Sequence, residues 1–165
     1  MTQKSHPIRA RLTPQTASAH CDIPCAIYDP SEAIIGALSV LRIMDIMIET
    51  AAKEGAEALA KANTIGRCVL RKEQEAERVK HEIRIIWGDY FKGGHLETHP
   101  HIHGVAHAIM VKASACKQEV NRQDALDLLE LVNQFAEAFW QTKNVASERK
   151  VCPYPPAEAV VYPIL

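Results

Sequence analysis

The chain has 165 residues, of which 47% are hydrophobic and 24% are charged, and its formal net charge is −1. This length and composition are typical of one soluble globular domain, and the near-neutral charge gives no indication of nucleic-acid binding. No apolar run is long enough to span a membrane. The five cysteines are odd in number and scattered, which argues against a secreted disulfide framework. We therefore expect a cytoplasmic protein with reduced thiols.

Residues 1–19, MTQKSHPIRARLTPQTASA, read as a polar leader. They carry Lys4, Arg9 and Arg11 and no acidic residue, and they lack the apolar core that a secretory signal peptide requires. Most chain ends of this kind are poorly ordered and have no further role. The residues alone therefore predict a disordered leader and assign it no function.

Residues 20–30, HCDIPCAIYDP, concentrate reactive side chains. Cys21 and Cys25 are the only cysteines close together in the sequence, and His20 directly precedes the first of them. Thiolates are soft ligands that suit nickel, copper or zinc. Two cysteines four residues apart are a weak signal by themselves, since a disulfide or coincidence would give the same pattern. The neighbouring His20 and Pro24 favour a metal site, whose further ligands are either distant residues or the backbone.

An amphipathic helix is predicted directly after this stretch. Asp29-Pro30-Ser31-Glu32 is a strong helix start, in which Asp29 caps the helix and Glu32 completes a capping box. Apolar residues three and four positions apart then continue the helix to about residue 58. Because they cover more than one face, we expect this helix to lie in a subunit interface, so the protein should be a homo-oligomer.

Three further helices follow from the same periodicity. One covers about residues 62–92 and ends at Gly93-Gly94, the next starts near Pro100, and the last starts after Asn121, a favourable cap. Short connections predict antiparallel neighbours, so we expect an all-α, up-down four-helix bundle over residues 31–143. The extension at residues 144–165 contains four prolines and should run extended over the surface or over a neighbouring subunit.

Two other kinds of metal site are less favoured. Five histidines lie between residues 95 and 107, and pairs four apart can bind zinc on a helix face. No cysteine or paired acidic motif accompanies them, so a solvated loop and first helical turn explain them better. A ferritin-like di-iron centre needs Glu-x-x-His segments, and the sequence contains none.

Residues 20–30 resemble the metal hook of nickel-containing superoxide dismutases. The segments WGDYFK, residues 87–92, and FWQTK, residues 139–143, also resemble that family. The resemblance covers about residues 20–143. It implies a homohexamer with one nickel ion per subunit and superoxide as the substrate. We refer to residues 20–30 as the hook.

The family resemblance gives the leader a purpose. It implies that a dedicated protease cleaves between Ala19 and His20. The freed α-amino group of His20, the amide nitrogen of Cys21 and the thiolates of Cys21 and Cys25 would then bind nickel in a square plane. The His20 imidazole would be an axial ligand in the oxidised state. Cycling between Ni(III) and Ni(II) would convert superoxide to dioxygen and hydrogen peroxide, and an uncleaved chain should be inactive.

The resemblance also implies roles around the nickel ion. Tyr28 would guard the open face of the ion, and Pro24 would turn the hook through a cis peptide bond. Asp22 and Lys92 would brace the hook and attract superoxide. Tyr90 would lie near the site, although its predicted place on the inner face of the second helix also suits a core residue.

Two positions depart from the pattern of the family that the sequence resembles. Gly36 stands where related proteins carry a glutamate that bonds to the histidine ring, and Glu75 stands where they carry an arginine. We hypothesise that Glu75 orients His20 instead; a solvated charge is the alternative. The competing function is a helical metal-binding or thiol-redox module that uses Cys21 and Cys25 without turning over superoxide.

Overall fold

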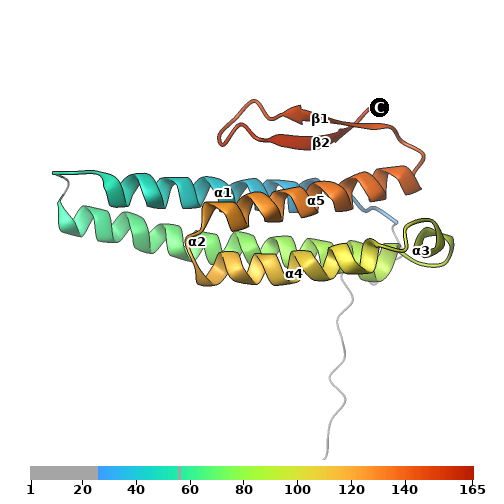
Figure 1. Ribbon diagram of the computed structural model, residues 1–165, viewed down its shortest axis with the longest axis horizontal. Coiled ribbons are helices and arrows are strands. Elements are labelled where there is room, and N and C mark those ends of the chain that lie inside the picture. Colours follow the sequence, from blue (N-terminus) through green and yellow to red (C-terminus); the bar gives the residue numbers. More distant parts are fainter. Residues whose placement is uncertain (1–25, 56) are drawn as a thin grey trace, which may run out of the picture.

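The computed structural model describes residues 26–55 and 57–165. Its helices are α1 (Ser31–Ala52), α2 (Ala58–Ile85), the π-helical segment η1 (Ile86–Tyr90), α3 (Gly94–Thr98), α4 (Ile102–Gln118) and α5 (Arg122–Thr142). Two strands follow, β1 (Ser147–Val151) and β2 (Ala159–Pro163). The four long helices lie side by side (Figure 1), which confirms the expected four-helix bundle. Within the described residues, no helix is long and apolar enough to cross a membrane.

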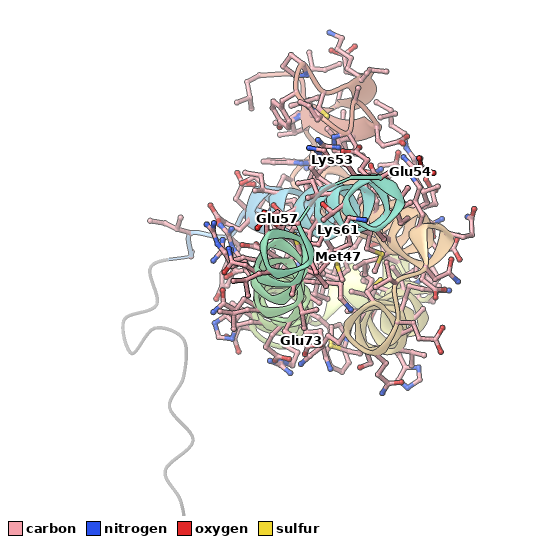
Figure 2. All side chains as sticks on the ribbon, turned by 90° about the vertical axis from the view of Figure 1, so that its left-hand side faces the viewer. Met47, Lys53, Glu54, Glu57, Lys61 and Glu73 are labelled. Atoms are coloured by element: carbon pink, nitrogen blue, oxygen red, sulfur yellow. The ribbon has the colours of Figure 1, made fainter. Side chains whose placement is uncertain are left out.

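The bundle core is made by the apolar positions that set the predicted periodicity. Each of α1 and α4 packs against both α2 and α5. The largest fully buried apolar side chains come from all four helices and include Met44, Ile83, Ile109, Phe135 and Phe139. Burying a side chain of this size stabilises a fold by roughly 1.5–3 kcal/mol. Figure 2, a view along the bundle, shows the four helices around this core.

The helix ends differ in detail from the predictions. α1 stops at Ala52 rather than near residue 58, because Lys53 is extended (ψ 115°) and Gly55 adopts a left-handed backbone (φ +67°). Asp29 accepts a hydrogen bond from the Ser31 amide at 2.8 Å. The predicted capping box is wrong, since Glu32 instead forms an ion pair with Arg78 of α2.

The later helices also begin and end at other residues than predicted. α2 starts at Ala58 and continues into η1, so its last turn is π-helical rather than α-helical. The short α3 precedes α4, which therefore begins at Ile102 rather than at Pro100. The cap at Asn121 is confirmed, because its side chain accepts a hydrogen bond from the Gln123 amide at 3.0 Å.

The C-terminal extension is extended, as expected, but it forms an antiparallel hairpin that the sequence analysis did not predict. β1 and β2 pair and lie over α1 and α5 (Figure 1). Asn133 of α5 donates to the Ala159 carbonyl at 3.0 Å and accepts from the Val161 amide at 3.1 Å. Arg149 binds Glu130 and Glu137, each at 2.6 Å. These contacts fix the hairpin to α5.

A buried lysine joins α2 to the end of α4. Lys72 is only 2% exposed. Its ammonium donates to the carbonyl oxygens of Cys116 at 2.5 Å, Lys117 at 2.7 Å and Glu119 at 3.0 Å. Carbonyl groups in the last turn of a helix have no partner within the helix, and a cation there also complements the helix dipole. Burial lowers the pKa of Lys72.

We predict that Lys72→Met lowers the free energy of unfolding by about 2–3 kcal/mol, because buried carbonyl groups lose their donor. Lys61→Met is the matched control. Lys61 donates to one carbonyl, that of Ala51, at the exposed turn between α1 and α2 (Figure 2), so its loss should change stability by less than about 0.5 kcal/mol. Urea denaturation measures both variants. An equal change in the free energy of unfolding of the two variants would show that the buried contacts of Lys72 add nothing to stability.

Candidate metal centre

The structure describes four of the residues that the sequence analysis assigned to the site: Tyr28, Glu75, Tyr90 and Lys92. Outside the described residues lie Ala19, His20, Cys21, Asp22, Pro24 and Cys25. Their predicted roles therefore stay predictions. What the structure gives is the surface to which the hook is attached.

Tyr28 of the hook meets Tyr90 at the end of the bundle where α1 begins. Their ring centroids are 5.5 Å apart. The Tyr90 ring also stacks on His95 at 4.8 Å and packs against Phe139 of α5 at 4.9 Å. Tyr28 belongs to the hook and follows Cys25 by three residues in the sequence. The two tyrosines that the sequence assigned to the site are therefore in contact with each other.

The hydroxyl group of Tyr90 is held by the end of α5. Its oxygen lies 2.6 Å from the Thr142 hydroxyl, and that hydroxyl donates to the Phe139 carbonyl at 2.6 Å. Thr142 has a single hydroxyl proton, so Tyr90 must be the donor in the first bond. Its oxygen therefore keeps only accepting capacity for other partners. The resemblance of FWQTK covered Thr142, but nothing in the sequence showed what it contacts.

Lysines flank this cluster. Lys92 is exposed two residues after Tyr90, and no ion pair of its side chain is found among the described residues. Lys143, which follows the end of α5, places its ammonium 4.6 Å from the centroid of the Tyr90 ring. Positive charge thus lies on the surface beside the two tyrosines.

Glu75 is a buried carboxylate and not the solvated charge that the sequence left as an alternative. It is 5% exposed and bonds to Arg71 at 2.6 Å and to Arg78 at 3.5 Å. Because Arg78 also pairs with Glu32, the network connects α2 with the first turn of α1. The charge of Glu75 is therefore compensated within the bundle.

Gly36 and Glu75 face each other across the contact between α1 and α2. A Cβ atom at Gly36 would lie 2.8 Å from Val79 Cγ2 and 3.4 Å from the Glu75 carbonyl oxygen. The backbones approach so closely that a larger side chain at this position requires Val79 to move. Glu75 lies fifteen residues before Tyr90, about 22 Å along a helix. A contact with His20 in the same chain therefore requires the hook to turn back along α1 and α2.

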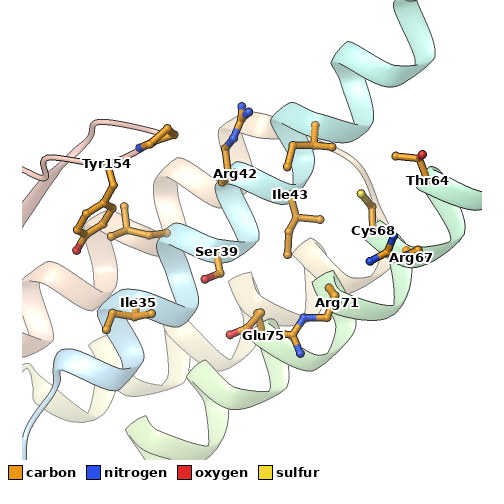
Figure 3. A pocket seen from close by; sticks show the side chains of 13 residues that line it. Ile35, Ser39, Arg42, Ile43, Thr64, Arg67, Cys68, Arg71, Glu75 and Tyr154 are labelled. Carbon is orange, nitrogen blue, oxygen red and sulfur yellow. Dashed lines mark hydrogen bonds and ion pairs between the residues drawn. The ribbon is translucent and has the colours of Figure 1, made fainter. Parts of the chain in front are cut away.

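A groove of about 710 Å³ runs between α1, α2 and the turn of the hairpin. Figure 3 shows Glu75 and Arg71 on its α2 side, Ile35 and Arg42 on its α1 side, and Tyr154 from the hairpin. The groove thus borders Glu75 rather than the two tyrosines.

The described part of the chain holds no cluster of three or more histidine, cysteine or acidic side chains that could bind a metal ion. Two of these histidines have other partners: His103 accepts a hydrogen bond from Trp87 at 2.9 Å, and His99 bonds to Gln141 at 3.0 Å. Cys68, Cys116 and Cys152 are free thiols. Burial raises the pKa of Cys116 to about 11, so it is protonated near neutral pH and unsuited to bind a metal.

Comparison with known proteins gives one consistent result. Residues 15–143 match the family described as nickel-containing superoxide dismutase. A nickel superoxide dismutase of Streptomyces seoulensis is 36% identical over 127 residues, which is 77% of this chain and 90% of the relative. One of Streptomyces coelicolor is 35% identical over 129 residues, 78% of this chain and 92% of the relative.

Solved structures agree with these relatives. Native nickel superoxide dismutase superposes with a TM-score of 0.66 at 33% identity and covers 76% of this chain and 99% of its own. The apo form gives 0.63 at 30% identity, over 72% and 98% of the two chains. The family match ends at residue 143, so the hairpin of β1 and β2 lies beyond it.

We predict that Gly36→Ala destabilises the protein by about 1–3 kcal/mol, because the added methyl group must displace Val79. Gly66→Ala is the control: it lies inside α2 with no atom within 4 Å of the new Cβ, and it should stabilise by about 0.5–1 kcal/mol. Thermal unfolding of the two variants measures the difference. A stabilising effect at both positions would contradict the close contact between α1 and α2.

Proposed function

Because the chain belongs to the nickel-containing superoxide dismutase family, we propose that it binds nickel through the hook and disproportionates superoxide. Two superoxide ions and two protons would give one dioxygen and one hydrogen peroxide. In this chain, the main supporting observation is the contact of Tyr28 with Tyr90, 5.5 Å between ring centroids, at the point where the hook joins the bundle.

The residues of the hook suit nickel chemically. The thiolates of Cys21 and Cys25, the amide nitrogen of Cys21 and the amine and imidazole of His20 would hold the ion, and such a mixed sulfur and nitrogen donor set suits Ni(II). Nickel held there would supply a one-electron couple, Ni(III)/Ni(II). The described residues offer no competing cluster of ligands.

The leader at residues 1–19 fits this proposal as a propeptide. In the full chain the nitrogen of His20 is part of a peptide bond, and a protonated amide is a poor metal ligand. Cleavage between Ala19 and His20 by a maturation protease would convert it to an amine. The chain would then consist of the leader, the hook, the bundle at residues 31–143 and the extension at residues 144–165.

The residues around the hook would control access to it. Tyr28 and Tyr90 would form an aromatic wall that limits entry to small molecules, and Lys92 would attract the superoxide anion. The bond from Tyr90 to Thr142 commits the Tyr90 proton, so Tyr90 would accept rather than donate a hydrogen bond at the site. Asp22 would brace the hook, and Pro24 would turn it.

Assembly and location complete the proposal. A homohexamer follows from the family resemblance, and exposed apolar side chains of α1, Ile35 at 43% and Ile48 at 46%, support an interface on that helix. The free thiols of Cys68, Cys116 and Cys152 are compatible with a reducing, cytoplasmic location.

We predict that protein beginning at His20 binds one nickel ion per subunit and removes superoxide, whereas protein beginning at Ala19 loses at least about 100-fold in rate. The two chains differ by one residue, which turns the amine ligand into an amide. Metal analysis and the rate of superoxide decay after pulse radiolysis measure the effect. Equal rates of superoxide removal by the two proteins would refute the role of the His20 amine as a ligand. Zinc in place of nickel in the protein that begins at His20 would favour the alternative function, a helical metal-binding or thiol-redox module.

We further propose that Glu75 orients the His20 ring in place of the missing glutamate at position 36. Its burial and its bonds to Arg71 and Arg78 would hold its carboxylate in one orientation. The geometry requires the hook to lie back along the groove beside Glu75, either in the same chain or across a subunit interface.

Glu75→Gln should lower the rate of superoxide removal by about tenfold or more and alter the axial nitrogen coupling in the Ni(III) electron paramagnetic resonance spectrum. Glu77→Gln is the control, since Glu77 is another ion-paired carboxylate of α2, bound to Arg84 and Lys117 on the surface. It should leave both readings unchanged. An unchanged rate and spectrum in Glu75→Gln would rule out the orienting role.

A further inference from the structure

The ammonium of Lys143 lies over aromatic rings at the C-terminal end of α5. Its ammonium lies 4.6 Å from the centroid of the Tyr90 ring and 5.7 Å from that of Phe139. Among the described residues, no ion pair of Lys143 is found. By contrast, Arg122 and Arg149, which lie on either side of it in sequence, each bind two carboxylates.

The position of this ammonium is fixed by its surroundings. Aromatic faces attract cations, so two rings hold the charge above Tyr90. The preceding residue, Thr142, bonds to the Tyr90 hydroxyl at 2.6 Å and thereby ties the end of α5 to the same ring. The ammonium is exposed to solvent on its other side, because Lys143 is an exposed residue. Its charge is therefore both localised and open to an approaching anion.

Lys143 is connected to the hook through two aromatic residues. Tyr90, under the ammonium, contacts Tyr28, and Tyr28 lies three residues after Cys25. The ammonium thus lies over the ring that contacts Tyr28, a described residue of the hook, where a unit charge acts on an approaching anion unless salt screens it.

We propose that Lys143 is a second cation that guides superoxide to the site, together with Lys92. The inference rests on the proposed function and extends it to a residue of α5's C-terminal end. Lys143 would act by attracting the substrate, without touching the metal. A fixed positive charge beside an aromatic wall raises the local concentration of a small anion and so increases the association rate.

Kinetics test the guiding role. At low ionic strength, Lys143→Gln should lower kcat/KM by about three- to tenfold, and the gap from wild type should close as salt is added, since screening removes the effect. Lys143→Arg should restore the rate. Lys53→Gln removes the same charge at the opposite end of the bundle (Figure 2) and should behave as wild type. If Lys143→Gln matches Lys53→Gln at every salt concentration, Lys143 does not guide substrate.

A second measurement does not depend on turnover. Azide, a small monovalent anion, is titrated at constant ionic strength into nickel-free protein that begins at His20 and carries ¹³C-labelled tyrosine. The four tyrosines can be assigned by substitution. Azide should shift the Tyr90 ring signal in wild type and in Lys53→Gln, and should bind at least about threefold more weakly to Lys143→Gln.

Failure of the proposed function can be distinguished from failure of the role proposed for Lys143. If wild-type protein loaded with nickel does not remove superoxide, the proposed function fails whatever Lys143 does. If wild type is active but Lys143→Gln changes neither the salt dependence nor the azide titration, only the role of Lys143 is refuted.

Discussion

The packing of the Tyr90 ring is the contact on which the geometry of the site depends. This one ring touches the segment before α1 through Tyr28, the segment after η1 through His95, and α5 through Phe139 and Thr142. It lies at the end of a π-helical turn. Such turns are rare in proteins, and those that occur are often found at functional sites. The extra residue in that turn changes the direction in which Tyr90 projects, compared with an uninterrupted α-helix. The bundle therefore presents a defined aromatic surface where Tyr28 of the hook precedes α1.

A second constraint acts between α1 and α2. Gly36 allows the two backbones to approach until a Cβ atom would lie 2.8 Å from Val79 Cγ2, so a larger residue at position 36 has to displace Val79. A carboxylate is instead buried on the opposite helix, where Arg71 and Arg78 compensate its charge. Glu75 faces the same contact between α1 and α2 as Gly36 does.

The sequence predicted what depends on local pattern. Periodic apolar positions such as Met44 and Ile83 predicted the bundle, and the cap at Asn121 predicted the start of α5. The hairpin was not predicted, because its position depends on Asn133, a polar residue in an otherwise ordinary helix. The burial of Glu75 was equally hidden, since a charged residue in an amphipathic helix is usually exposed. Contacts between distant segments determine both features, and periodicity does not report them.

The central claim is that cleavage before His20 creates a redox-active nickel site at the end of the bundle. The most direct measurement is the electron paramagnetic resonance spectrum of oxidised, nickel-loaded protein that begins at His20. The account predicts a low-spin Ni(III) signal with hyperfine coupling to one axial nitrogen, and loss of that coupling in His20→Ala. A nickel-loaded protein that gives no Ni(III) signal, or that keeps the coupling without the His20 ring, would contradict it.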